Sequence, residues 1–178
     1  YIDSERLVRP EQEYISRWNY ACEIQAGKYE IDDYDFERPK VDLATRSKGS
    51  REHALADYEI YDYPGDYLKT ADGKQYADVR INELQTQFEI ARGDSNARGL
   101  ASGSLFKLTG QARPDQNREY LILSVVYKMT FNAYETGEEQ SASCTCQFTA
   151  LNSKQHFRPR RATARPFVQG PQTAVVVG

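Results

Sequence analysis

The stretch EIYDYPGDYLKTADGK, from Glu59 to Lys74, combines carboxylates with aromatic rings around a Pro-Gly turn. Carboxylates beside tyrosines can line a sugar-binding cleft or hold a metal ion. The pair Pro64-Gly65 marks a tight turn, and a linker that wraps over the rest of the fold would have the same composition. The stretch therefore leaves three interpretations open: a carbohydrate site, a metal loop and a connecting segment.

A second group of carboxylates lies upstream, in a segment where acidic residues alternate with tyrosine and phenylalanine: Glu30, Asp32, Asp33, Asp35 and Glu37. A pair of them could serve a glycosidase, and several could bind calcium. The segment IDDYDFE, however, lacks the glycine and the regular spacing of a calcium loop. We interpret it as a solvated acidic strand edge, which would also discourage unwanted strand pairing.

The residues that nucleophilic catalysis needs are few. The two histidines, His53 and His156, stand in no recognisable motif, and no GxSxG, P-loop or GxGxxG opens a helix. The three cysteines, Cys22, Cys144 and Cys146, contain no CxxC pair. We expect them to be buried structural thiols rather than a zinc site or a disulfide. The sequence thus predicts no catalytic, metal-binding or cofactor-binding residue, and no cofactor.

Basic residues gather near the C-terminus, in FRPRRATARPFVQGP. The prolines favour an extended backbone, and the arginines could contact phosphates or pair with acidic neighbours. The net charge of the whole chain is -3, so we expect no overall attraction to nucleic acid or to an anionic membrane. No apolar run approaches the length of about 20 residues that a membrane span needs. We expect neither nucleic-acid binding nor stable membrane insertion.

Short apolar runs separated by polar turns predict a β-rich fold. The strongest predicted strands are YLILSVVYKMTF and SCTCQFTAL, and LFKLTG is a shorter one. The polar segment TRSKGSREHALAD is expected to be a loop. Near the N-terminus, alternation places four residues on one face of a strand: Trp18, Tyr20, Cys22 and Ile24.

One segment, ADGKQYADVRINELQTQFEIARG, predicts an amphipathic helix. Its apolar residues recur at spacings of three and four, as in a helix that docks one face on a sheet: Ala77, Ile81, Leu84, Phe88 and Ala91. Gly93 follows the last of them, and we expect it to terminate the helix at the C′ position.

The composition and the two ends of the chain suggest that it packs against other polypeptide segments. The chain has 178 residues and 13 tyrosines, with a mean hydropathy of -0.75. Such a polar, tyrosine-rich chain is expected to bury extra surface against other chains. It begins without Met and ends in TAVVVG, a β-branched run with no turn after it. We expect this run to be a strand whose partner lies outside the chain, and the chain to be a piece of a longer polypeptide.

Several segments together resemble one family: DYDFERP, YEIYDYPGDY followed by a polar helix, GDSNARGLASGSLFKLTG, NREYLILSV and FRPRRATARPFVQGPQTAVVVG. In this order they are similar to VgrG, the spike protein of bacterial type VI secretion, in its region similar to the baseplate hub of contractile phage tails. The resemblance runs from about Asp33 to the end. The residues that mark it are Tyr61, Asp62, Tyr63, Pro64, Gly65, Arg158, Pro159, Arg161, Pro166, Gly170 and Pro171.

The resemblance implies a mainly β fold with one clear helix, built as antiparallel β-barrel tube domains like those of contractile phage tail hub proteins. Residues 1–48 would complete a first barrel or begin the second. Residues 49–75 would form a loop and the YDYPG connector. Residues 76–168 would hold the helix and a second barrel tube domain. Residues 169–178 would lead into a small β-barrel that this chain does not contain.

The resemblance also implies a structural role without catalysis. The chain would form a homotrimer that caps the hexameric inner-tube protein, helps to puncture target envelopes and delivers effectors. Effector or adaptor proteins and a tip protein would bind regions outside this chain. Assembly would take place in the bacterial cytoplasm, followed by secretion or delivery into target cells. The alternative is a carbohydrate-binding or carbohydrate-active β-domain that uses the Tyr/Asp-rich stretch.

The resemblance implies that the Tyr/Asp-rich stretch is a connector, which bends at Pro64-Gly65 and enters the helix from roughly Lys74. Its tyrosines would then be packing anchors that fasten the turn to the barrel while the acids stay in solvent: Tyr58, Tyr61, Tyr63 and Tyr67.

Overall fold

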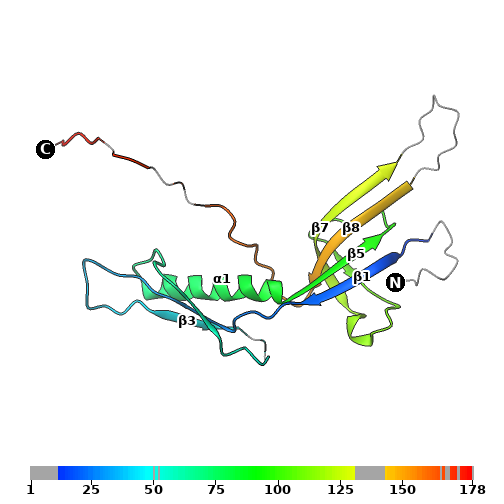
Figure 1. The fold of residues 1–178 in the computed structure, drawn as a ribbon, viewed down its shortest axis with the longest axis horizontal. Coiled ribbons are helices and arrows are strands. Elements are labelled where there is room, and N and C mark those ends of the chain that lie inside the picture. The colour runs from blue at the N-terminus through cyan, green and yellow to red at the C-terminus, as the bar shows by residue number, and fades with distance from the viewer. Residues whose placement is uncertain are drawn as a thin grey trace.

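Two β-sheets and one long helix make up the described part of the chain (Figure 1). The computed structural model describes residues 12–49, 51, 53–130, 143–164, 166, 169–171 and 173–177. The helix lies along the smaller sheet, and the larger sheet begins where the helix ends (Figure 1). The mainly β fold with one helix that the sequence predicted is confirmed.

The larger sheet has five antiparallel strands in the order β1-β5-β8-β7-β6 and is curled like half of a barrel (Figure 1). Its strands are β1 (Ile15–Cys22), β5 (Glu89–Ser95), β8 (Ser143–Asn152), β7 (Glu119–Thr130) and β6 (Leu105–Lys107). The register of β7 against β8 shifts between Ile122 and Ser124. Such an irregularity increases the local twist, which favours a curled sheet over a flat one.

Aromatic rings pack together in the core cluster of this sheet. The buried residues of the cluster are Ala91, Leu108, Tyr120, Phe148 and Ala150. The Trp18 ring packs edge-on against Tyr120, with 4.9 Å between ring centroids. A Cβ atom at Gly93 would lie 2.5 Å from the ring of Phe148, so glycine is needed where this ring covers β5.

The smaller sheet has three strands in the order β3-β2-β4. They are β3 (Thr45–Lys48), β2 (Lys28–Ile31) and β4 (Glu59–Asp62). β2 pairs antiparallel with β3 but parallel with β4, so this sheet is mixed. Helix α1 (Thr70–Phe88) packs on it, and the shared core contains Tyr29, Ile31, Leu43, Tyr67, Ala77 and Ile81, with Leu84 at its margin.

Helix α1 confirms the predicted apolar stripe only as far as Phe88. Glu89 already has extended backbone angles, with φ -134° and ψ 110°, and the chain continues directly as β5. Ala91 and Gly93 therefore belong to a strand, where they pair with Tyr20 and Trp18 of β1. The expected helix end at Gly93 is wrong, because the residues after Phe88 form strand hydrogen bonds to β1 and β8 in place of another helical turn.

Several predicted loops and strands also differ from the structure. Part of the segment predicted as a polar loop is β3, and residues 49–75 include β4 and the first residues of α1. The segment YETGEEQ, which is one of the polar turns that the sequence predicts between strands, lies outside the described residues. The described residues of 173–177 form no strand, and Val175, Val176 and Val177 are 88–93% exposed. The expectation that this run is a strand whose partner lies outside the chain remains a prediction.

The proposed residue ranges cut across the two sheets. Residues 1–48 supply β1 to the larger sheet and β2 and β3 to the smaller one, and residues 76–168 contain most of α1 and the strands β5 to β8. The proposed assignment of these ranges to successive barrels remains a prediction.

Candidate functional site

The Tyr/Asp-rich stretch crosses from the edge strand of the smaller sheet to the start of α1. Tyr61 and Asp62 end β4, and the following Tyr63-Pro64 peptide bond is cis. The Gly65 N–H donates a 2.9 Å hydrogen bond to the Asp32 carbonyl, which fixes the turn on the end of β2. The stretch is therefore a connecting segment whose backbone is tied to its own sheet.

Most of the tyrosines in this connector do not pack as the sequence suggested. Tyr58, Tyr61 and Tyr63 are 64%, 58% and 55% exposed, so the expectation that they anchor the turn is wrong. Tyr58 precedes the edge strand β4 and Tyr61 belongs to it, so helix α1 does not cover their rings. Only Tyr67 of the four is buried, with 5% exposure.

Tyr67 fills a slot between two glycines. A Cβ atom at Gly65 would lie 2.4 Å from the Tyr67 ring, and one at Gly73 would lie 2.3 Å from it. Beyond the ring, the hydroxyl lies 2.6 Å from the Leu43 carbonyl and 2.8 Å from the Ile31 carbonyl. Burial raises the pKa of this hydroxyl, so it stays a hydrogen-bond donor. One ring thus joins β2, the segment before β3 and α1.

The acidic side chains near the connector are used internally, and two of them are buried. Asp33 accepts hydrogen bonds from the backbone N–H groups of Asp66 and Tyr67. Glu30 and Asp35 are 8% and 3% exposed, so the interpretation of IDDYDFE as a solvated edge is wrong at these two positions.

Asp35 shows why a carboxylate is buried here. One of its oxygens accepts hydrogen bonds from the backbone N–H groups of Glu37 and Arg38. The other forms a 2.8 Å ion pair with the Arg38 guanidinium. Burial alone would raise the pKa of the Asp35 carboxyl, but the Arg38 contacts outweigh it and hold this pKa below its usual value. Among the residues that the structure describes, no group of three or more His, Cys, Asp or Glu side chains could hold a metal ion.

Asp62 joins the connector to the arginine-rich segment. It accepts a 2.8 Å hydrogen bond from the Tyr29 hydroxyl, and burial together with this bond raises the pKa of Tyr29 to about 12. On its other side Asp62 lies 3.7 Å from the Arg161 guanidinium. Arg161 also joins Asp62, Pro64 and Gly65 in lining a small pocket of about 180 Å³. The structure thus brings together Asp62, Pro64, Gly65 and Arg161.

The arginine-rich segment after β8 is held along α1 mainly through its backbone. The Arg158 N–H donates a 3.1 Å hydrogen bond to the hydroxyl of Thr86, and the Arg161 N–H donates a 2.7 Å bond to Glu83. Thr86 is 1% exposed, so the acceptor of this bond is buried, whereas Arg158 itself is exposed. Pro159, Pro166, Gly170 and Pro171 are exposed, and no contact joins them to the connector among the described residues.

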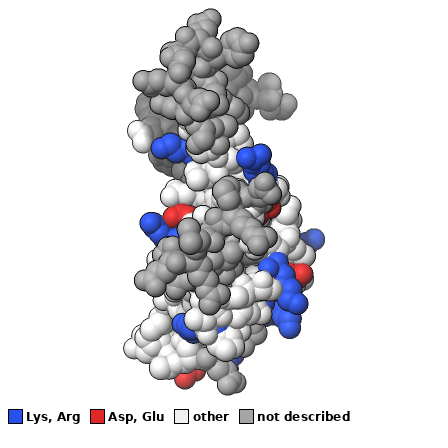
Figure 2. Space-filling view, turned by 90° about the vertical axis from the view of Figure 1, so that its right-hand side faces the viewer, with Lys and Arg blue, Asp and Glu red and all other residues white. Residues whose placement is uncertain are grey.

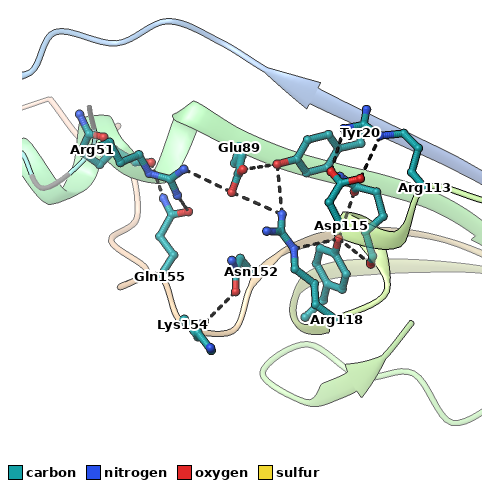
Figure 3. Close-up of polar contacts among 12 residues, drawn as sticks. Tyr20, Arg51, Glu89, Arg113, Asp115, Arg118, Asn152, Lys154 and Gln155 are labelled. Atoms are coloured by element: carbon teal, nitrogen blue, oxygen red, sulfur yellow. Dashed lines mark hydrogen bonds and ion pairs between the residues drawn. The ribbon is translucent and has the colours of Figure 1, made fainter. Parts of the chain in front are cut away.

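A polar network that the sequence gave no reason to expect lies between the two sheets (Figure 3). Its centre is Glu89, the first residue after α1. The Tyr20 hydroxyl of β1 donates to one oxygen of this carboxylate, and Arg51 and Arg118 lie 3.3 Å and 3.5 Å from the other. The Arg51 guanidinium also donates to the Gln155 side chain after β8. These residues are far apart in sequence, so no motif spacing could have revealed them.

The network fixes the charges of its members. Burial raises the pKa of Tyr20, and the hydrogen bond to Glu89 raises it further. Burial alone would raise the pKa of Glu89, but the Tyr20 hydrogen bond and the charges of Arg118 and Arg51 lower it overall. Glu89 is thus a carboxylate and Tyr20 a neutral donor. The arrangement holds charges in place and provides no group poised to exchange a proton near neutral pH.

A cleft of about 660 Å³ opens beside this network. It is lined by Lys48, Gly49, Arg51, Asn82, Gln85, Glu89, Arg118, Asn152, Lys154, Gln155 and His156. The lining comes from β3, α1, β5 and the turn after β8, so the cleft lies where the elements of both sheets meet.

One histidine and two of the three cysteines are at least partly buried. The His53 ring stacks on Phe88 at 5.3 Å between centroids, and its Nδ1 accepts a hydrogen bond from the Leu55 N–H. Cys146 is buried and Cys144 is partly buried, as predicted, but Cys22 is exposed because it ends the edge strand β1. The prediction of a buried thiol at Cys22 is wrong. No helix in the described ranges combines the length and apolar character that a membrane crossing needs.

Comparison with known proteins agrees with the fold. Residues 2–133 match the family model described as phage tail baseplate hub (GPD). The chain is 46% identical over 173 residues to the type VI secretion system spike protein VgrG1b of Pseudomonas aeruginosa, covering 97% of this chain and 23% of that protein. It is 44% identical over 173 residues to VgrG1c of the same organism, covering 97% of this chain and 24% of that protein.

A more distant relative carries another name. The chain is 25% identical over 168 residues to the actin cross-linking toxin VgrG1 of Vibrio cholerae, covering 93% of this chain and 15% of that protein. The chain thus spans about a quarter or less of the curated relatives it matches. The resemblance to VgrG spike proteins is confirmed, and the chain belongs to the phage tail baseplate hub (GPD) family.

Proposed function

We propose that this chain is the hub part of a type VI secretion spike, acts as a homotrimer and has no catalytic role of its own. The observation that carries the proposal is the identity of 44–46% to VgrG spike proteins over 97% of the chain, together with the baseplate hub match. In this role the hub caps a hexameric inner tube, helps to puncture target envelopes and delivers effectors. Assembly precedes secretion, and effector, adaptor and tip proteins bind elsewhere on the spike.

The surface of the chain supports a role in an assembly. Large apolar side chains lie in solvent in the part of the chain that the structure describes: Phe36, Val126 and Met129 are 75%, 68% and 52% exposed. Surfaces of this kind are typical of subunits that bury more area against partners.

The open edges of the larger sheet support the same proposal. Among the described residues, β6 pairs with β7 only from Glu119 to Leu121, and β1 pairs only with β5. Curled sheets with unpaired edges are closed in proteins by further strands or by neighbouring subunits. A head-to-tail contact between unlike edges generates a closed ring when the rotation is right.

The Tyr/Asp-rich stretch does not favour the carbohydrate alternative. Its central carboxylate, Asp62, already accepts a hydrogen bond from Tyr29 and faces Arg161. The test is the mass in solution, by light scattering, of this chain extended to the length of its relatives. We expect three copies. A strict monomer that hydrolyses a glycan, with the hydrolysis lost in Asp62→Asn, would overturn the hub proposal.

A further inference from the structure

The cleft beside Glu89 carries a charge opposite to that of the rest of the chain. Its lining contains four permanent cations, namely Lys48, Arg51, Arg118 and Lys154, and one carboxylate, Glu89. With His156 neutral, the lining has a net charge of +3. Since the whole chain carries -3, the residues outside the cleft carry -6.

Figure 2 shows lysines and arginines at several positions on the part of one face that is not grey, with acidic residues beside some of them. A low-dielectric cleft lined by one sign of charge concentrates its field on the space inside it. The charge distribution thus favours an anionic group inside the cleft over an extended polyanion lying on the surface.

Both arginines are held in place before any ligand arrives. The Arg51 guanidinium lies over the ring of Phe88 at 4.7 Å, and that of Arg118 lies over the Tyr120 ring at 5.4 Å. Arg118 donates from Nε to the Tyr120 hydroxyl and from Nη2 to the Tyr20 hydroxyl. These contacts leave its Nη1 hydrogens for a further acceptor. A guanidinium ordered in this way loses little side-chain entropy when it binds a carboxylate.

The two lysines of the cleft have no ion pair among the described residues. Both are exposed, one at the end of β3 and the other in the turn after β8. The Asp57 carboxylate, whose charge acts on Lys48, forms its own ion pair with Lys28 at 3.0 Å. The ammonium groups of Lys48 and Lys154 are therefore free to meet carboxylates that enter the cleft.

We propose that this cleft binds an acidic segment of a second polypeptide chain, with at least two carboxylates placed between the ordered arginines and the exposed lysines. A volume of about 660 Å³ suits several side chains rather than one small ion. Both arginines already pair with the carboxylate of Glu89, which indicates that the site prefers carboxylate ligands. The aromatic rings nearby lie beneath the guanidinium groups and offer no free face on which a nucleotide base could stack.

The proposal goes beyond the hub role and does not depend on it. Its test is the binding of a fluorescently labelled hexaglutamate peptide to the 178-residue chain, followed by fluorescence anisotropy at low salt. We expect saturable binding that weakens as salt is added. Replacing both exposed lysines of the cleft (K48Q with K154Q) should weaken it about tenfold.

A matched variant with the same change in net charge provides the control. Lys69, just before α1, and Lys128, on β7, are exposed and do not line the cleft, and K69Q with K128Q should leave the affinity within about twofold of the unchanged chain. Equal losses in both double variants would show diffuse attraction and overturn the proposal. It would also be overturned if hexaglutamate did not bind, if hexaglutamine bound equally well, or if inorganic phosphate displaced the peptide at equal concentration.

Discussion

The hydroxyl of Tyr67 lies 2.6 Å from the backbone carbonyl of Leu43, in the interior between β2 and α1. Leu43 is 1% exposed, so its carbonyl depends on this hydroxyl for a hydrogen-bond donor in place of water. The ring that carries the hydroxyl is also the largest side chain between the connector and the helix. The relationship makes Tyr67 the residue that fastens the connector to the fold.

Shortening this side chain should destabilise the protein in two steps. Tyr67→Phe removes the donor to a buried carbonyl and should lower the free energy of unfolding by about 1 kcal/mol. Tyr67→Ala also empties the slot between the glycines and should cost about 3–5 kcal/mol. Urea unfolding followed by circular dichroism measures both. The control is Tyr61→Ala with Tyr63→Ala, which should change the value by about 0.5 kcal/mol or less because both rings are exposed.

The glycines on either side of the Tyr67 ring should not tolerate a methyl group. A Cβ atom at Gly73 would lie 2.3 Å from the ring, so Gly73→Ala must displace it and should cost about 1–3 kcal/mol despite the higher helix propensity of alanine. Thermal unfolding gives the comparison. Gly99→Ala is the matched control, since nothing lies within 4 Å of that position. Equal effects at the two glycines would contradict the packing described for Tyr67.

The sequence predicted the regular elements better than the contacts between them. Alternation in β7 and β8 and the stripe from Ala77 to Phe88 were sufficient to place those elements, because both patterns reflect which face is buried. The end of α1 was misplaced, since Ala91 continues the helical stripe by coincidence and is buried by strand neighbours instead.

The sequence could not show which tyrosine of the connector is buried. Tyr61, Tyr63 and Tyr67 have equivalent sequence surroundings, and only the positions of Gly65 and Gly73 around one ring separate them. The network around Glu89 was invisible for a related reason, because Tyr20 and Arg118 meet it only after the larger sheet has formed. Tertiary pairing decides these features, and no local pattern encodes them.

Neutralising Glu89 should weaken the junction between the sheets in a pH-dependent way. Glu89→Gln leaves Arg51 and Arg118 without their shared carboxylate and should cost about 1–3 kcal/mol near neutral pH. Because the pKa of Glu89 is lower in the folded protein than its ordinary value of 4.5, its contribution is complete above that value. The contribution is lost as the pH falls through the folded pKa.

The measurement is the free energy of urea unfolding of both proteins between pH 3 and pH 7. The difference between them should be largest at the upper end and should shrink below about pH 4.5. Glu119→Gln, a change at an exposed position on β7, is the control and should show a small difference at every pH. A difference for Glu89→Gln that stays constant down to pH 3 would contradict the role assigned to its charge.

The arginine-rich segment should loosen when its buried contact on α1 is removed. Thr86→Val keeps the shape of the side chain but removes the oxygen that accepts from the Arg158 N–H at 3.1 Å. The described residues of the segment form no strand or helix, and backbone bonds attach it to α1: this one, one from the Arg161 N–H to Glu83, and one from the Thr86 hydroxyl to the His156 carbonyl just before it. We expect the amide of Arg158 to exchange with deuterium about tenfold faster, the effect of losing about 1.4 kcal/mol of protection.

Thr145→Val, on the exposed face of β8, is the control and should leave the exchange rate of the Arg158 amide unchanged. If the Arg158 amide exchanged at the same rate in the Thr86→Val variant, the segment would be held by its arginine side chains, and Arg161→Ala would then be the variant that releases it.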